Sequence, residues 1–187
     1  MYRTVIKLDR RKNRKEIADR NMMHKFVLRF FEGGRAEANV LFQVIEEADF
    51  YVVIQSEKKP ENLKNIDVER IEKIDDGIAS VQTGDVLQFT GEFACMKKRD
   101  GKEIRPSGIN ERLVWTAEKA ERNGFRIISF YSAESPDAKM IRDRKVNIPS
   151  TIFRGLLQVT DAEKFKKTLK NGIGTYKSFG CGMLTVR

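Results

Sequence analysis

The sequence TDAEKFKKTLKNGIGTYKSFGCGMLTV, residues 160–186, combines a helix signal, a glycine-rich loop and a strand signal in that order. Its first four residues, Thr160 to Glu163, form a capping-box pattern, which predicts the start of a helix. Gly172 follows the last helical turn and predicts its C-terminal cap. The apolar run at residues 183–186 then predicts a strand, so the loop joins a helix to a strand.

The loop itself contains four glycines around one lysine and one serine. Successive backbone N–H groups in such a loop can form a concavity that binds anions, and a lysine adds positive charge. The pattern differs from the Walker loop and from dinucleotide loops, which need a strand before and a helix after the glycines. A helix cap followed by a tight turn is the alternative interpretation. The candidate anion contacts are Gly174, Lys177, Ser178 and Gly180. Gly174, Gly180 and Gly182 are expected to permit a tight backbone path with their N–H groups pointing outward.

The second half of the chain reads as strand, helix, strand, strand, helix, strand. Alternating apolar residues and helical periodicity predict these elements. Their order is that of the ferredoxin-like βαββαβ motif. The predicted elements are strand 87–95, a helix from Asn110 to Gly124, strand 125–132, strand 148–159, the helix that begins at Thr160, and strand 183–186.

The first half repeats this order more loosely, with strand 2–8, helix 14–31, a hairpin of strands 40–46 and 50–56, a short helix within 60–72 and a weak strand within 74–81. The expected fold class is α+β, with two tandem ferredoxin-like (RRM-like) domains. Thr83-Gly84-Asp85 is the best boundary, which predicts domains at residues 1–84 and 85–187.

Composition narrows the function. No apolar run is long enough to span a membrane, and the N-terminus has no secretory pattern. Cys95 and Cys181 are too few for a disulfide framework, which predicts reduced thiols in a cytoplasmic protein. His24 is the single histidine, so no structural metal and no cofactor are expected.

The charge is unevenly distributed along the chain. Residues 1–85 contain 16 basic and 16 acidic side chains, whereas residues 86–187 contain 20 and 11, so the net charge of +9 belongs to the second half. A basic half beside a neutral half predicts a polyanionic partner such as nucleic acid. A generic basic surface is the simpler alternative.

Two insertions carry many of these basic residues. Asp100-Gly101 in the first is a two-residue hairpin signal, so this insertion is expected to form a protruding ribbon that can meet phosphates or base edges. The second insertion lies between two predicted strands, and solvated loops are the alternative for both. The candidate RNA contacts are Lys97, Lys98, Arg99, Lys102 and Arg105 in the first insertion, and Lys139, Arg142, Arg144 and Lys145 in the second.

His24 is the candidate catalytic residue. It falls at one edge of the apolar face of the first long helix, beside Met23 and Phe26. Histidine is suited to proton transfer near neutral pH. RNA supplies its own nucleophile, the 2′-OH, so a protein that cuts RNA has mainly to align it and move a proton. A structural histidine is the alternative.

Several stretches resemble the CasE family of CRISPR-associated repeat endoribonucleases from type I-E systems. They are the terminal GIGTYKSFGCGMLTV, the helical HKFVLRFF that begins at His24, the strand FYVVIQSE, the start Met1-Tyr2 and the basic hairpin. This resemblance covers the whole chain and implies two ferredoxin-like domains. Family members often carry a tyrosine three residues before the histidine, where this chain has Asn21, which can donate a hydrogen bond but has no phenol.

The resemblance implies binding of a CRISPR repeat stem-loop and metal-independent cleavage on its 3′ side, with His24 as the catalytic histidine. It also implies a 2′,3′-cyclic phosphate product that stays bound within the Cascade complex, with its protein subunits as partners. Two alternatives are a non-catalytic RNA-binding subunit on the same fold, and an enzyme that binds a small phosphorylated molecule. The position of the glycine loop after a helix argues against the second.

Overall fold

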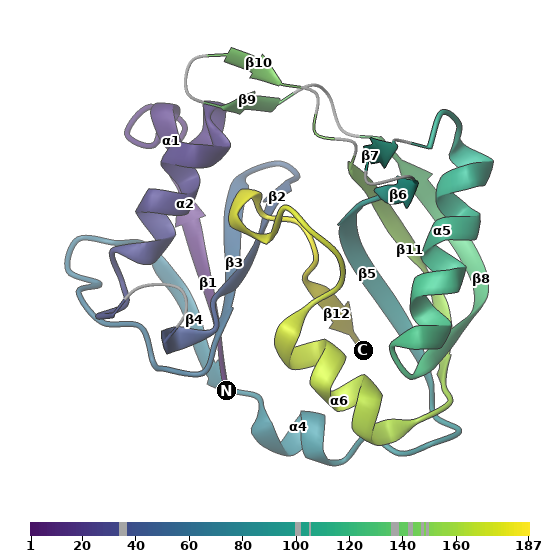
Figure 1. Cartoon of the computed structure of the whole chain (residues 1–187). Coiled ribbons are helices and arrows are strands. Elements are labelled where there is room, and N and C mark those ends of the chain that lie inside the picture. Colours follow the sequence, from purple (N-terminus) through teal and green to yellow (C-terminus); the bar gives the residue numbers. More distant parts are fainter. Residues whose placement is uncertain are drawn as a thin grey trace.

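The computed structural model describes residues 1–33, 37–99, 102–104, 106–135, 139–141, 144–146, 148 and 150–187. Two four-stranded antiparallel sheets lie on either side of the C-terminal segment, and helix α6 (Ala162–Asn171) of that segment lies between them (Figure 1). Within the described ranges, no helix is both long and apolar enough to cross a lipid bilayer.

The first sheet contains β1 (Tyr2–Leu8), β2 (Leu41–Glu46), β3 (Phe50–Ser56) and β4 (Val68–Lys73). Its strand order is β2-β3-β1-β4, so the first and third strands of the chain lie at the centre. This is the ferredoxin-like order, which confirms the predicted fold of the first half. The predicted first strand and the predicted hairpin are also confirmed.

The predicted helix 14–31 is wrong in one respect, because two helices replace it. They are α1 (Arg14–Ala18) and α2 (Arg20–Leu28). Asp19 between them has an extended backbone, and its carboxylate accepts hydrogen bonds from the N–H groups of Asn21 at 2.7 Å and Met22 at 3.3 Å. A short acidic side chain competes with helical hydrogen bonding and favours a capping position, so Asp19 starts a new helix.

The predictions for residues 60–81 are wrong. No helix lies between residues 57 and 67, all of which the structure describes, and β4 occupies the end of the predicted helix. The expected weak strand is instead α4 (Asp75–Ala79). Most residues of β4 face solvent, so its sequence has little apolar pattern, and pairing with β1 decides its conformation.

The second sheet contains β5 (Val86–Ala94), β8 (Phe125–Glu134), β11 (Ser150–Val159) and β12 (Leu184–Val186), in the order β12-β5-β11-β8. The helices α5 (Ile109–Arg122) and α6 (Ala162–Asn171) complete the predicted βαββαβ unit. The capping prediction is wrong by one residue, because Asp161 rather than Thr160 caps α6 and accepts from the Lys164 N–H. Gly172 ends the helix as predicted.

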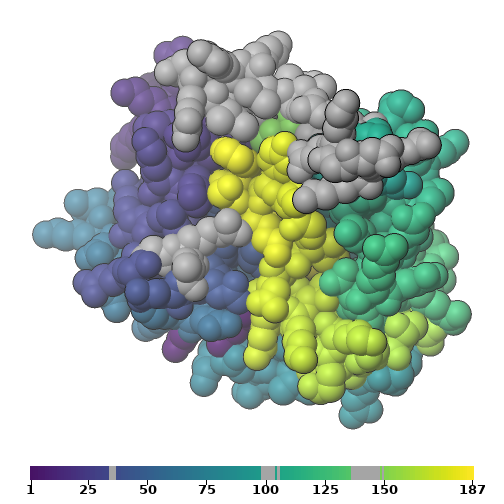
Figure 2. All heavy atoms as spheres, in the orientation of Figure 1, coloured from purple at the N-terminus to yellow at the C-terminus, as the bar shows by residue number. Residues whose placement is uncertain are grey.

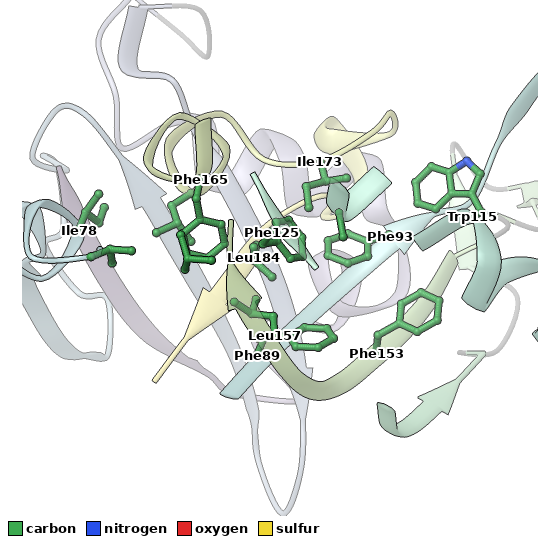
Figure 3. Close-up of a cluster of buried hydrophobic side chains, with 14 of the residues drawn as sticks. Ile78, Phe89, Phe93, Trp115, Phe125, Phe153, Leu157, Phe165, Ile173 and Leu184 are labelled. Atoms are coloured by element: carbon green, nitrogen blue, oxygen red, sulfur yellow. The ribbon is translucent and has the colours of Figure 1, made fainter. Parts of the chain in front are cut away.

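Aromatic side chains dominate the core of the second half (Figure 3). Phe93 stacks on Phe153 with ring centroids 6.0 Å apart, and Phe125 meets Phe165 edge-on at 5.3 Å. Such pairs add specific geometry to the area they bury. Ile78 of α4 also belongs to this cluster, so part of the first half of the sequence helps to build the second core.

The two cysteines are buried and not paired in a disulfide, as predicted. Burial raises the pKa of Cys95 to about 11, so its thiol stays protonated at neutral pH.

Two short ribbons extend from the second sheet. The predicted first ribbon is confirmed, because β6 (Lys97–Arg99) pairs with β7 (Lys102–Ile104) and sets Arg99 opposite Lys102. Its expected turn, residues 100 and 101, lies outside the described residues. The second insertion also contains a ribbon, of β9 (Lys139–Ile141) and β10 (Arg144–Val146). Sequence periodicity did not indicate this second pairing.

Replacing Asp19 by alanine is expected to lower the free energy of unfolding by about 1 kcal/mol, because two N–H groups at the start of α2 lose their acceptor. Asp19→Asn keeps a side-chain oxygen at the cap and is the matched control. Urea unfolding followed by circular dichroism measures both variants. Equal stability of wild type and Asp19→Ala would contradict this account of the helix break.

Candidate functional site

The glycine loop runs from Gly172 to Gly182 and contains a short 3-10 helix, η1 (Lys177–Phe179). Gly172, Gly174, Gly180 and Gly182 all have positive φ, between 71° and 89°, as the glycine spacing predicted. Two backbone hydrogen bonds of 2.7 Å close the loop, from Ile173 N–H to the Gly182 carbonyl and from Gly182 N–H to the Glu92 carbonyl. The loop is therefore tied to the central strand β5.

The expectation that the N–H groups of Gly180 and Gly182 point outward is wrong. Gly180 donates to the Lys177 carbonyl at 3.2 Å, and Gly182 donates to Glu92. Gly180 is buried, whereas Gly174 is exposed. Closing so short a loop consumes these N–H groups, which leaves Gly174 as the predicted glycine contact on the surface.

The two side chains predicted to meet phosphate, those of Lys177 and Ser178, lie in η1 and are both half-buried. The Lys177 ammonium donates a 2.6 Å hydrogen bond to the carbonyl of Asn171, in the last turn of α6. A cation at a helix C-terminus is electrostatically favourable. Lys177 thus helps to hold the loop, and its predicted contact with phosphate remains a prediction.

His24 lies on α2, half-buried, at the edge of a face whose members Met23, Phe26 and Val27 are buried. Its ring lies nearly parallel to that of Phe42 on β2, with centroids 6.4 Å apart and an interplanar angle of 19°. The ring therefore borders the core of the first half, where its Nε2 atom is buried, while the residue as a whole keeps partial exposure. This is the environment that the helical periodicity predicted.

The fold brings predicted site segments from both halves together. The helix α2 packs against both η1 and β9 (Figure 1), so the histidine-bearing helix meets the glycine loop and the second basic ribbon. In Figure 2 the C-terminal segment forms a strip on the surface between the two halves. His24, Lys177 and Ser178 thus belong to neighbouring elements, although they are distant in sequence.

The first basic ribbon is connected to the same loop through Trp115 of α5. The Trp115 indole N–H donates a 2.9 Å hydrogen bond to the Met96 carbonyl, immediately before β6. A Cβ atom added at Gly174 would lie 3.3 Å from Cη2 of the Trp115 ring, so this ring also packs against the loop. Trp115 thus joins the base of the ribbon to the loop, a role that the sequence did not indicate.

Lys97 is exposed at the start of the first ribbon. The backbones of Lys98, Arg99 and Lys102 lie in this ribbon, and those of Lys139, Arg144 and Lys145 lie in the second. Two predicted contacts, Arg105 and Arg142, lie outside the described residues.

A pair of buried charges beside the loop was not predicted from the sequence. Arg20 Nη2 of α2 lies 3.7 Å from Glu92 Oε2 of β5. A glutamate in the middle of the apolar strand sequence LQFTGEFA is the signal that could have revealed it, because acidic residues are rarely buried without a partner. Asn21, which stands where the resemblance implies a tyrosine, is half-exposed in the first turn of α2.

Comparison with known proteins gives a consistent picture. A model of the family described as CRISPR-associated protein matches residues 1–187. The CRISPR-associated endoribonuclease Cse3 of Thermus thermophilus is 25% identical over 101 residues, which cover 46% of this chain and 47% of that protein. The aligned region thus spans about half the length of that relative.

Solved structures resemble the whole chain. Thermus thermophilus Cse3 bound to an RNA representing a pre-cleavage complex has a TM-score of 0.83 and 21% identity, covering 100% of this chain and 98% of that chain. Cas6e from Escherichia coli K-12 has a TM-score of 0.77 and 21% identity, with coverage of 100% and 98%. A chain of a CRISPR RNA-guided surveillance complex, pre-nicking, has a TM-score of 0.71 and 20% identity, with coverage of 100% and 99%. At these identities the likeness establishes the fold.

Gly180→Val is expected to destabilise the protein by roughly 2 kcal/mol or more, because a β-branched residue resists positive φ and has no room. A Cβ atom there would lie 3.0 Å from Arg20 Nη1 and 3.0 Å from Phe42 Cε2. Gly84→Val is the matched control, since Gly84 has a φ of 100° and no atom within 4 Å of such a Cβ. Thermal unfolding compares the two variants, and equal losses of stability would show that crowding at residue 180 contributes nothing.

Proposed function

The chain belongs to the family of CRISPR-associated proteins, and we propose that it is a CasE-type endoribonuclease. It binds the stem-loop of a CRISPR repeat in precursor RNA and cuts on the 3′ side of the stem without a metal ion. The observation that carries this proposal is the position of His24, on a helix packed against both the glycine loop and the second basic ribbon. The RNA-bound relative of the same fold supports it.

The proposed reaction needs little from the protein beyond alignment and proton transfer. The 2′-OH of the scissile nucleotide attacks the adjacent phosphorus, the 5′-oxygen leaves, and a 2′,3′-cyclic phosphate forms. His24 transfers a proton as general acid or base, since this half-buried residue lies at the edge of the core with its ring packed beside Phe42. Asn21 can add a hydrogen bond but cannot supply the phenol of related proteins.

The RNA stem is held mainly through its backbone in this proposal. Folded RNA is recognised largely by shape and phosphate contacts, and the two basic ribbons supply positive charge on either side of the loop. Gly174, Lys177 and Ser178 meet a phosphate at the loop itself. The product then stays bound, and the protein acts in the cytoplasm as a subunit of a Cascade complex. A chain of similar fold in a surveillance complex supports this step.

A non-catalytic RNA-binding subunit is the second candidate. The replacement of the family tyrosine by Asn21 is the observation that favours it. Incubation of a labelled cognate repeat with the protein in EDTA separates the two candidates, because only the proposed enzyme produces a shorter RNA with a cyclic phosphate end.

His24→Ala is expected to lower the single-turnover cleavage rate by roughly 10²–10⁴-fold, the usual contribution of a positioned proton-transfer group. Affinity for the repeat should stay near that of the wild type, because the basic ribbons are intact. A repeat with a 2′-deoxy scissile nucleotide should resist the wild-type enzyme. Cleavage by His24→Ala at the wild-type rate would refute the catalytic assignment.

Replacing Lys97, Lys98 and Arg99 together by alanine is expected to weaken repeat binding and reduce its salt dependence. Because fewer phosphates are then neutralised by the protein, the slope of log K against log salt should fall by about two. The control removes Lys58, Lys59 and Lys64, which follow β3 in the neutral half and carry the same total charge. Binding titrations at several salt concentrations measure both, and an unchanged slope for the ribbon variant would place the RNA elsewhere.

A further inference from the structure

Two oppositely charged side chains are buried where the two halves meet. The side chain of Arg20 is 12% exposed and that of Glu92 is 1% exposed, with Nη2 and Oε2 3.7 Å apart. Removing two charges from water is costly, and apolar residues of similar size often give equal or greater stability. A buried pair is therefore better explained by the geometry that it imposes than by the stability that it adds.

Glu92 is the fixed member of the pair. It lies in β5, an inner strand of the second sheet, opposite Ile152 of β11. The Ser150 hydroxyl donates a 2.7 Å hydrogen bond to Glu92 Oε1, and the Glu92 carbonyl accepts from Gly182 N–H. The carboxylate thus has a defined position relative to the glycine loop and to β11, whose first residue is Ser150.

Arg20 is the member that belongs to the histidine-bearing helix. Arg20 and His24 are four residues apart on α2, so they lie on the same helical face. A Cβ atom at Gly180 would lie 3.0 Å from both Arg20 Nη1 and the Phe42 ring, and that ring stacks on His24. Arg20, Gly180, Phe42 and His24 therefore form one continuous layer of contacts.

From these contacts we propose that the Arg20–Glu92 ion pair is a positioning device, which holds the His24 face of α2 in register with the glycine loop. This inference rests on the proposed function, because it assigns Arg20 and Glu92 an effect that acts through His24. Glu92 is buried and the Arg20 side chain is only 12% exposed, so the pair offers little open binding surface. Proton transfer depends steeply on distance, and a displacement of about 1 Å can reduce a rate about 10²-fold.

The experiment compares Arg20→Gln, Glu92→Gln and the double variant by single-turnover cleavage at saturating repeat RNA, with repeat affinity and thermal unfolding measured in parallel. Each single variant is expected to cut about 10- to 100-fold more slowly, with affinity near that of the wild type. The double variant should cut no more slowly than the slower single variant, because residues that act as one unit give non-additive effects. Arg20→Lys keeps the charge and should recover part of the rate.

A matched control removes an exposed ion pair of the first half. Lys7 Nζ lies 2.5 Å from Asp49 Oδ2 with both side chains at least one-third exposed, so Lys7→Gln should leave the cleavage rate unchanged. The double variant also guards against misfolding, because it leaves neither member of the buried pair charged without the other. It therefore reports on positioning even where Glu92→Gln alone unfolds.

Three results would overturn the inference. Cleavage by Arg20→Gln and by the double variant at the wild-type rate, with His24→Ala inactive, would show that the pair has no effect on catalysis. Weaker repeat binding with an unchanged rate at saturation would instead make Arg20 an RNA contact. Cleavage by His24→Ala at the wild-type rate would overturn the proposed function as well, and this outcome is distinct from the other two.

Discussion

The glycine loop is the constraint on which the two halves depend. It leaves α6 at Gly172, passes between the sheets and enters β12, which pairs with the inner strand β5. The hydrogen bond from Gly182 N–H to the Glu92 carbonyl ties it to β5, while Gly180 lies against Phe42 of the first sheet. Side chains at these glycines would meet neighbouring atoms, so their absence lets the halves approach each other.

The same approach accounts for the composition of the site. Bringing α2 against the loop buries part of His24 and places Arg20 beside Glu92 in a region that excludes water. Electrostatic interactions strengthen as water is excluded, but each unmatched charge becomes costly. The exposed cation Lys97 at the start of the first ribbon bears no such cost, because it remains hydrated until it meets a polyanion and displaces its counterions.

Prediction from the sequence is most accurate where one side of an element faces an apolar core. The second half, with its aromatic residues at strand and helix spacing, matches the predicted βαββαβ order closely. The predictions fail at β4, where an exposed edge strand has little apolar pattern, and at Asp19, where local capping overrides a continuous helical pattern. For the site, helical periodicity placed His24 at the edge of the apolar face. The outward N–H groups expected at Gly180 and Gly182 are wrong, because both groups donate hydrogen bonds within the protein when the loop closes.

Three features can be predicted from the amino-acid sequence: the two ferredoxin-like units, the positive φ of the loop glycines and the concentration of positive charge in the second half. They follow from local periodicity, backbone sterics and composition. Which of these segments meet depends on the three-dimensional packing of the chain. The contact of α2 with η1 and β9, the Arg20–Glu92 pair and the bridge made by Trp115 join residues distant in sequence. Such contacts arise from the packing of whole elements, and no local pattern encodes their partners.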